Sequence, residues 1–362
     1  MDNSIINKLK QKNKELINIV IEKVQKEYQN DIDLIGVCGS FFTGDFYEKS
    51  DLDLLVVLNN ERGWGFSTCF ILDGIGYDLY GSPWTKLEEM ASFDHTFVSH
   101  IVDVDIVYCR ELKCRERFME LRQKALNIIS SPKTTELLQK SRKHLDNATL
   151  TYGKMMLEEE IGTVRQLSGG VIHHLTNTVC FLNHNYLKLG VKHQLEEMLG
   201  MKHVPKHFEQ YFNGVILATS VPNIKETTTK LIRAVKEMYD EIAEEVLKKI
   251  LPTKDNLKGT YEEIWSNWKN KIQHAAEHKD ILLAFSSGVS CQNFYDEMHR
   301  EHGTVSINLM KHFQPNNLDS FANAFEQAMQ LYKEEYDRVQ MKVLTYDYID
   351  AFRRDYLEPE NV

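Results

Sequence analysis

The sequence is short of the residues that mark several large protein classes. It has only six cysteines in 362 residues, and none of them forms a C-x-x-C pair. This scatter excludes a disulfide framework or a zinc-finger pattern and is typical of reduced thiols in a cytoplasmic protein. No segment approaches the roughly 18 consecutive apolar residues of a membrane span, and the first residues lack the apolar core of a signal peptide. We therefore expect a cytoplasmic protein with no membrane association.

Basic residues are also in deficit, because 43 lysines and arginines face 53 acidic residues and give a formal net charge of −10. Proteins that grip long nucleic acids usually present a basic face, so a nucleic-acid partner is disfavoured. Hydrophobic residues make up 42% of the chain and aromatic residues 10%, which suits packed cores and argues against disorder. A chain of this length is too long for one compact core, so we expect two or three domains.

The hydrophobic pattern changes along the chain. An amphipathic helix is predicted over residues 4–29, with lysines and glutamates between its apolar positions. Short apolar runs then predict strands at 33–38, 51–58, 70–72, 76–80 and 104–108, with a helix between the last two.

After about residue 111 the strand signals disappear. Helices are predicted over 111–128, 134–158, 159–198 and 223–250, followed by an aromatic-rich helical block at 259–357. Within 159–198, Gly169-Gly170 is expected to break the helix or to allow close packing, and Gly190 is a candidate C-cap.

These signals predict an α+β protein, in which an N-terminal mixed sheet flanked by helices precedes all-helical domains. We assign residues 1–125 to a catalytic domain, 126–255 to a helical domain that completes the cleft, and 256–362 to a further helical domain. The last of these is a candidate for part of the acceptor cleft or for a homodimer interface.

The chemically informative residues lie between the first two predicted strands. Asp51 and Asp53 are two positions apart, and on a strand they would share one face with Cβ atoms about 7 Å apart. Two carboxylates held that close are costly unless a cation neutralises them, and Mg²⁺ prefers such oxygen ligands. Gly39-Ser40 ends the preceding strand where a helix would begin, so backbone amides and the serine hydroxyl are available to phosphate oxygens. Metal and triphosphate binding therefore converge on one edge of the sheet.

This arrangement resembles the polymerase-beta-like nucleotidyltransferase superfamily. A strand, Gly39-Ser40, about ten residues and Asp51-x-Asp53 on a strand form its signature, and residues 33–80 are most similar to the small-molecule branch that contains the aminoglycoside and lincosamide nucleotidyltransferases. The resemblance implies transfer of a nucleoside monophosphate from a nucleoside triphosphate, AMP from ATP in the first instance. It also implies two Mg²⁺ ions and the release of pyrophosphate. Gly39, Ser40, Ser50 and Arg165 are the predicted nucleotide-binding residues.

Family members usually bring a third carboxylate from a later strand, and Asp78 in Gly76-Tyr77-Asp78-Leu79-Tyr80 is the best match. Asp51, Asp53 and Asp78 are thus the predicted catalytic and metal-binding residues. The general base stays open between Asp78 and a glutamate of the helical domain, for which Glu158, Glu159 and Glu160 are candidates.

Several other residues are weaker candidates. Asp103 and Asp105 form a second D-x-D, but no Gly-Ser precedes it, so a structural role is favoured. Lys188 is a further candidate for the triphosphate, although exposure to solvent is the favoured alternative. The histidine pairs lack an H-E-x-x-H context and are expected to be structural or exposed.

The acceptor is not specified by these residues. The leading hypothesis is a hydroxyl of a small molecule, with an aminoglycoside-type antibiotic as the choice made by resemblance, and the acidic surface suits a polycation. The alternatives are adenylylation of a protein or RNA partner, and a regulatory protein of the toxin–antitoxin type.

Overall fold

The computed structural model describes residues 3–131, 135–247 and 251–357. The chain divides into two compact units, residues 1–243 and 244–362. The predicted boundaries at 125/126 and 255/256 fall inside helices, because α5 spans Leu112–Ser130 and α11 spans Lys254–Leu257. The three-domain assignment stays a prediction. In the described parts of the chain, no helix is both long enough and apolar enough to cross a bilayer.

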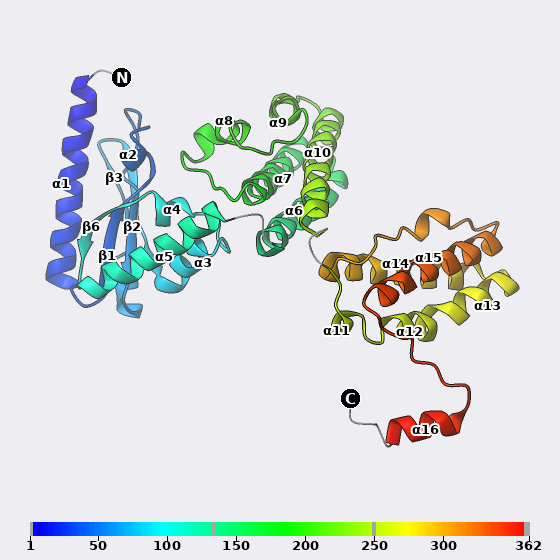
Figure 1. Ribbon diagram of the computed structural model, residues 1–362. Coiled ribbons are helices and arrows are strands. Elements are labelled where there is room, and N and C mark those ends of the chain that lie inside the picture. The colour runs from blue at the N-terminus through cyan, green and yellow to red at the C-terminus, as the bar shows by residue number, and fades with distance from the viewer. Residues whose placement is uncertain (1–2, 132–134, 248–250, 358–362) are drawn as a thin grey trace. The chain divides into compact units, whose positions relative to one another are not determined.

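The first unit opens with helix α1 (Asn3–Glu27) and a four-stranded mixed sheet (Figure 1). The strand order is β5-β2-β1-β6, in which β1 is antiparallel to β2 and β6 while β2 is parallel to β5. The strands are β1 (Ile32–Val37), β2 (Leu54–Leu58), β5 (Gly81–Pro83) and β6 (Asp105–Cys109). Strands β3 (Thr68–Leu72) and β4 (Ile75–Leu79) form a separate antiparallel hairpin. The predicted α+β class is confirmed.

Both faces of the sheet are covered, which explains why the central strands β1 and β2 are apolar without alternation. On one face, Ile35 and Val56 pack against Val20 and Val24 of α1. On the other, Leu34 joins a core with the helices α3 (Trp84–Ala91), α4 (Ser99–Val102) and α5.

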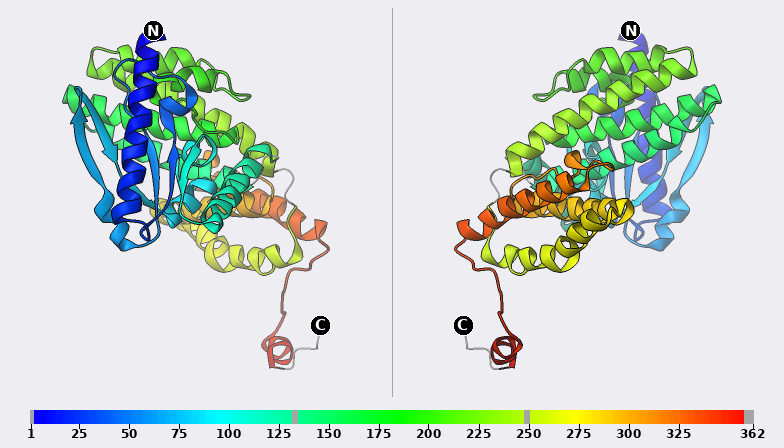
Figure 2. Two further views of the ribbon diagram at one scale, coloured as in Figure 1. Left: turned by 90° about the vertical axis from the view of Figure 1, so that its left-hand side faces the viewer. Right: turned by 90° about the vertical axis from the view of Figure 1, so that its right-hand side faces the viewer.

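The remainder of the first unit is helical. The helices are α6 (Thr135–Met156), α7 (Ile161–Leu182), η2 (Val191–His193), α8 (Gln194–Leu199), α9 (Phe208–Leu217) and α10 (Val221–Leu247). Helices α6 and α7 pack side by side (Figure 2). Helix α7 also contacts the part of the unit that contains the sheet, residues 3–130, here called the sheet domain. Phe181 of α7 packs edge-on against Phe93 there, with ring centroids 5.5 Å apart.

Two helix predictions need correction here. The predicted helix over 159–198 ends at Leu182, because the Asn183 side chain bonds the carbonyl of Val179 and that of His203 and turns the chain. Gly190 has a φ of +72° but precedes η2 instead of ending a helix. Gly169 and Gly170 lie inside an unbroken α7, where a Cβ on Gly170 would be 3.2 Å from Thr151 of α6. The close-packing alternative is therefore confirmed for Gly170.

The second unit is all helical, as predicted for 259–357. It contains α11, α12 (Thr260–Ile264), the π-helical η3 (Trp265–Lys269), α13 (Asn270–His278), α14 (Ile281–His302), η4 (Met310–His312), α15 (Leu318–Arg338) and α16 (Ile349–Leu357). Its core contains the fully buried rings of Phe321, Phe325 and Tyr332.

Candidate active site

The site begins where β1 ends and the short helix α2 (Gly39–Thr43) starts. Gly39 has a φ of +65°, and a Cβ at this position would lie 1.9 Å from Oδ2 of Asp53. A residue with a side chain would therefore collide with the carboxylate and would also adopt a disfavoured backbone conformation. The backbone N–H of Ser40 donates a hydrogen bond to the same carboxylate. The expected meeting of Gly39-Ser40 with the aspartates is thus present in the structure.

Asp51 and Asp53 do not lie on a strand, contrary to prediction. Strand β2 begins at Leu54, and the two aspartates occupy the segment just before it. The backbone still continues the pairing, because the N–H of Cys38 donates to the carbonyl of Asp53 at 3.1 Å. The predicted strand 51–58 begins three residues too early, because the regular pairing of β2 ends at the pair Val37–Leu54 and the chain turns into α2 at Gly39. Both aspartates are half-buried.

Asp53 is the most perturbed carboxyl group of the site. Burial first, and then the charges of Asp51 and Asp78, together raise its pKa to about 6, against the opposing effect of the hydrogen bond from Ser40. The three predicted carboxylates are therefore close enough to interact electrostatically. Asp78 itself lies on the exposed side of β4, directly opposite Cys69 of β3.

A cavity of about 420 Å³ opens beside these residues. The sheet side of its wall includes Gly39, Ser40, Asp51 and Asp53. Ser50 also lines it, and its Oγ accepts a hydrogen bond from the backbone N–H of Tyr47 at 2.9 Å. A cavity of this size is in the range that binds small ligands.

The opposite side of the cavity comes from the helical part of the unit. Helix α7 contributes His173, Asn177 and Phe181, and the following loop contributes Tyr186. His100 of α4 also lines the cavity, and burial first, with Lys86 and His95 contributing, lowers its pKa to about 4. Its imidazole is therefore neutral near pH 7.

Residues 186–193, here called the strap, are fixed to the sheet domain at two carboxylates. Asp103 accepts a hydrogen bond from the Tyr186 hydroxyl at 2.6 Å and pairs with Lys188 at 3.4 Å. The second D-x-D thus has the structural role expected of it at Asp103, while Lys188 lines the cavity and is also half-exposed.

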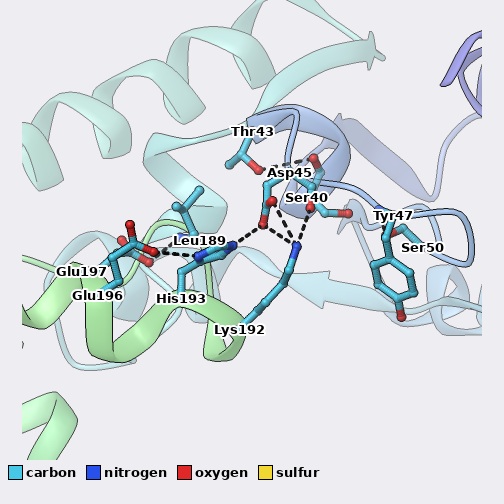
Figure 3. Close-up of polar contacts among 10 residues, drawn as sticks. All are labelled: Ser40, Thr43, Asp45, Tyr47, Ser50, Leu189, Lys192, His193, Glu196 and Glu197. Atoms are coloured by element: carbon cyan, nitrogen blue, oxygen red, sulfur yellow. Dashed lines mark hydrogen bonds and ion pairs between the residues drawn. The ribbon is translucent and has the colours of Figure 1, made fainter. Parts of the chain in front are cut away.

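The second attachment is Asp45, in the loop after α2. Figure 3 shows Lys192 and His193 both pointing toward its carboxylate. Lys192 Nζ is 3.0 Å from each carboxylate oxygen, and His193 Nε2 is 2.8 Å from one of them. Hydrogen bonding to Glu196, with Asp45 adding to it, raises the pKa of His193. Asp45, Lys192 and His193 carry no recognisable motif, and only the fold brings them together.

Besides Asp78, which lies on the hairpin, four predicted residues do not line this cavity. Arg165 is exposed near the start of α7, about two turns before His173. Glu160 caps the same helix by accepting the backbone N–H groups of Gly162 and Thr163 at 2.7 and 2.6 Å. Glu159 pairs with Lys225 at 2.9 Å, and Glu158 is exposed. The capping and surface contacts account for these side chains without any role in the cavity.

The donor set fits a magnesium ion. Among the residues that the structure describes, no group of three or more histidine, cysteine or acidic side chains is arranged to hold a metal by itself. Magnesium does not require such a cage, because it is usually held by one or two carboxylates together with water and substrate phosphates. The half-buried carboxylates of Asp51 and Asp53, close to that of Asp78, offer oxygen ligands of that kind.

Comparison with known protein families gives a match over the segment that contains Gly39, Ser40 and the three aspartates. Residues 17–128 match the family model of the nucleotidyltransferase domain. No curated protein matches the chain. The matched residues run from α1 into α5 and include Gly39, Ser40, Asp51, Asp53 and Asp78. The chain therefore carries a nucleotidyltransferase domain and is a transferase of nucleotidyl groups.

Proposed function

We propose that this enzyme transfers a nucleoside monophosphate, AMP from ATP in the first instance, to a hydroxyl group of a small molecule and releases pyrophosphate. The observation that carries the proposal is the contact between Gly39-Ser40 and Asp53 beside Asp51 and Asp78, at the wall of a cavity of ligand size. Phosphoryl transfer depends mainly on positioning and on charge compensation, and this wall offers groups for both.

Each residue has a distinct part in the proposal. The backbone of Gly39 and Ser40 allows a phosphate group to come close, because no side chain at residue 39 stands in the way. Asp51 and Asp53 would hold Mg²⁺, together with Asp78, and the ion supplies charge compensation for the transferred phosphoryl group. Two ions are expected from the resemblance. Lys188 and Lys192, which pair with Asp103 and Asp45, line the same cavity and would contribute positive charge toward a triphosphate there.

Asp78 is the favoured proton acceptor for the attacking hydroxyl. It faces solvent next to Asp51, whereas Glu158, Glu159 and Glu160 are exposed and lie outside the cavity. A carboxylate in reach of the reacting oxygen suits a general base. For the acceptor, an aminoglycoside-type antibiotic remains the proposal that the resemblance supports, and the formal net charge of −10 suits a polycation.

The test is pyrophosphate release with each of the four nucleoside triphosphates against a panel of hydroxylated acceptors, with and without Mg²⁺. We expect magnesium-dependent release with ATP and at least one small hydroxylated compound, aminoglycosides included. Labelling of protein or RNA with no turnover of any small acceptor would reject the small-molecule assignment.

A further inference from the structure

Asp51 lines two spaces. The first is the cavity that Gly39, Ser40 and Asp53 also line. The second is an open groove over the β3–β4 hairpin, lined by Asp51, Cys69, Phe70, Ile71, Gly76, Tyr77 and Asp78. Of the three site carboxylates, Asp51 borders both spaces, Asp53 borders only the cavity and Asp78 borders only the groove.

The chemistry of the proposed transfer assigns different reactants to these spaces. In phosphoryl transfer the attacking oxygen and the leaving oxygen are roughly in line on opposite sides of the phosphorus. The leaving pyrophosphate belongs on the Gly39-Ser40 side, where backbone amides can receive it. The attacking hydroxyl must then approach the phosphorus from a different direction, and the groove is a second space that shares Asp51 with the cavity and also contains Asp78.

We propose that the outer face of the β3–β4 hairpin, formed by Cys69, Ile71, Gly76, Asp78 and Tyr80, is the acceptor subsite, and that it takes an uncharged or cationic molecule with an apolar face next to the reacting hydroxyl. This inference rests on the proposed function, because it needs a nucleotide in the cavity.

The hairpin separates its residues into two faces. Phe70 and Tyr77 stack on each other with ring centroids 5.3 Å apart, on the face that packs toward α1. Cys69 and Asp78 are cross-strand partners, as are Ile71 and Gly76, and all four are exposed. Figure 2 shows the hairpin at the edge of the first unit.

The outer face exposes two large side chains with apolar surface, Ile71 and Tyr80. The side chain of Ile71 is 81% exposed and that of Tyr80 is 56% exposed. The Cys69 thiol and the Tyr80 hydroxyl are 2.9 Å apart and hydrogen-bonded, which holds the tyrosine ring at the end of the face. An exposed isoleucine and an exposed aromatic ring beside a reactive carboxylate suit the apolar side of a bound molecule.

The negative charge of the groove disfavours acceptors that are themselves negatively charged. The residues that line the groove in the described structure include the carboxylates of Asp51 and Asp78 and no lysine or arginine. A phosphate-rich acceptor would be repelled there, since nucleic-acid binding depends on cations that neutralise phosphates. A neutral or cationic acceptor meets no such penalty.

With the acceptor in the groove, the transfer needs only the nucleoside triphosphate and the acceptor hydroxyl as reactants. The acceptor oxygen forms a bond to the α-phosphorus, and the bond from that phosphorus to the bridging oxygen of the β-phosphate breaks. Pyrophosphate leaves with the electron pair of the broken bond. The hydroxyl proton passes to the carboxylate of Asp78.

Cys69 allows a direct test because it carries an exposed thiol at the proposed subsite. A hydroxyalkyl methanethiosulfonate, used in two-carbon and six-carbon lengths, would tether an alcohol to Cys69 through a disulfide. The protein would carry Cys109→Ser, because Cys109 is also partly accessible. The tethered enzyme would then be incubated with Mg²⁺ and ATP labelled at the α-phosphate.

We expect label on the tether, released by a reducing agent, at least tenfold above a matched control. The control is Cys69→Ser with Thr68→Cys, which moves the tether by one residue and therefore to the other face of the strand. Equal labelling of the two proteins would overturn the subsite. An absence of label in an enzyme that releases pyrophosphate with a free acceptor would overturn it while sparing the proposed function. An absence of both label and pyrophosphate release would reject both.

A second variant tests binding without a tether. Ile71→Glu should raise the KM of the acceptor found in the panel at least fivefold and leave the KM of ATP unchanged. The matched control is Ile19→Glu on α1, where the isoleucine is 60% exposed. An unchanged acceptor KM in Ile71→Glu, or an equal rise in the control, would contradict the assignment.

Discussion

At the scale of single residues, the position of the Asp53 carboxylate requires a glycine at residue 39. The Cα of residue 39 is so close to the Asp53 carboxylate that only hydrogen fits between them, and the positive φ of Gly39 independently favours glycine. The sequence predicted both residues as parts of a site, but from residue type and spacing alone. The contact that makes the glycine necessary depends on the fold.

We predict that Gly39→Ala abolishes nucleotidyl transfer and lowers the free energy of unfolding by about 2–4 kcal/mol. The added methyl group displaces Asp53 and strains the backbone. Gly44→Ala is the control, because Gly44 has a φ of +79° but nothing lies within 4 Å of its Cβ position. That control should lose only about 1–2 kcal/mol, the cost of the left-handed backbone. Urea denaturation measures both, and equal losses would contradict the clash.

The pKa of Asp53 predicts a pH dependence of stability. Because burial and neighbouring carboxylates raise this pKa to about 6, the folded state holds the proton to higher pH than the unfolded state. The free energy of unfolding should therefore fall as pH rises from about 4 through 6. Asp53→Asn should be more stable than the wild type by about 1–3 kcal/mol at pH 7.5 and equal to it at pH 3.5, without metal.

The same variant separates stability from metal binding. Magnesium ions should raise the melting temperature of the wild type at pH 7.5 and leave Asp53→Asn unchanged. Thermal melts at the two pH values, with and without the ion, measure this. A variant that is less stable at pH 7.5 would show that Asp53 is not an uncompensated buried carboxylate.

At the scale of secondary structure, the sequence predicted β1, β2 and β6 of the sheet and both strands of the hairpin, but it missed β5 and misplaced the ends of some elements. Apolar runs are sufficient to locate a buried strand such as β1, because burial on both faces removes the alternation. They do not show where a neighbouring element ends the ladder, as α2 does before β2. Likewise, helical periodicity continued past Leu182, while the Asn183 side chain redirects the chain through a partner twenty residues later.

The ion pairs of Asp45 with Lys192 and His193 should limit the mobility of the strap, residues 186–193. Asp45→Ala removes the ion pairs with Lys192 and His193, so we expect faster hydrogen exchange across residues 186–193 and a higher KM for ATP. Hydrogen exchange followed by mass spectrometry measures the first effect. Glu226→Ala, which removes an exposed ion pair with Lys230 on α10, is the control and should change neither quantity.

The effect of Asp45→Ala should also depend on pH. The pKa of His193 is raised, so its charged form, and with it the attraction to Asp45, is fully present below about pH 6.5 and is lost as pH rises through the folded-state pKa. The difference in exchange between wild type and variant should therefore be larger at pH 6 than at pH 8.5. A larger difference at pH 8.5 would contradict the contact.

At the scale of the whole molecule, the class of the fold and the sheet side of the site were predictable, whereas the opposite wall was not. Gly39, Ser40, Asp51 and Asp53 lie within fifteen positions and share a local pattern. Their partners across the cavity, such as Asn177 and Lys192, follow more than a hundred residues later on ordinary helical sequence. Only the packing of α7 against the sheet domain brings the two walls together.

The second unit should respond to its own core substitutions independently of the first. The Tyr336 hydroxyl accepts the backbone N–H of Tyr261 at 2.8 Å and contacts the carbonyl of Leu257 at 2.6 Å. Tyr336→Phe should lower the stability of residues 244–362 by about 1–3 kcal/mol, because buried backbone groups lose a partner. Hydrogen exchange should leave residues 1–243 unchanged. The exposed Tyr348→Phe is the control, and a loss of protection in the first unit would contradict independent cores.

The central claim is that Asp51 and Asp53, facing Gly39-Ser40, form the transfer site. The most direct measurement is the transfer of label from α-labelled ATP to an acceptor in the presence of Mg²⁺, for the wild type and for Asp51→Asn with Asp53→Asn. Far-ultraviolet circular dichroism would establish that both proteins are folded. We predict at least a thousandfold lower rate in the double variant, equivalent to about 4 kcal/mol of transition-state stabilisation. An unchanged rate in the folded double variant would contradict the account.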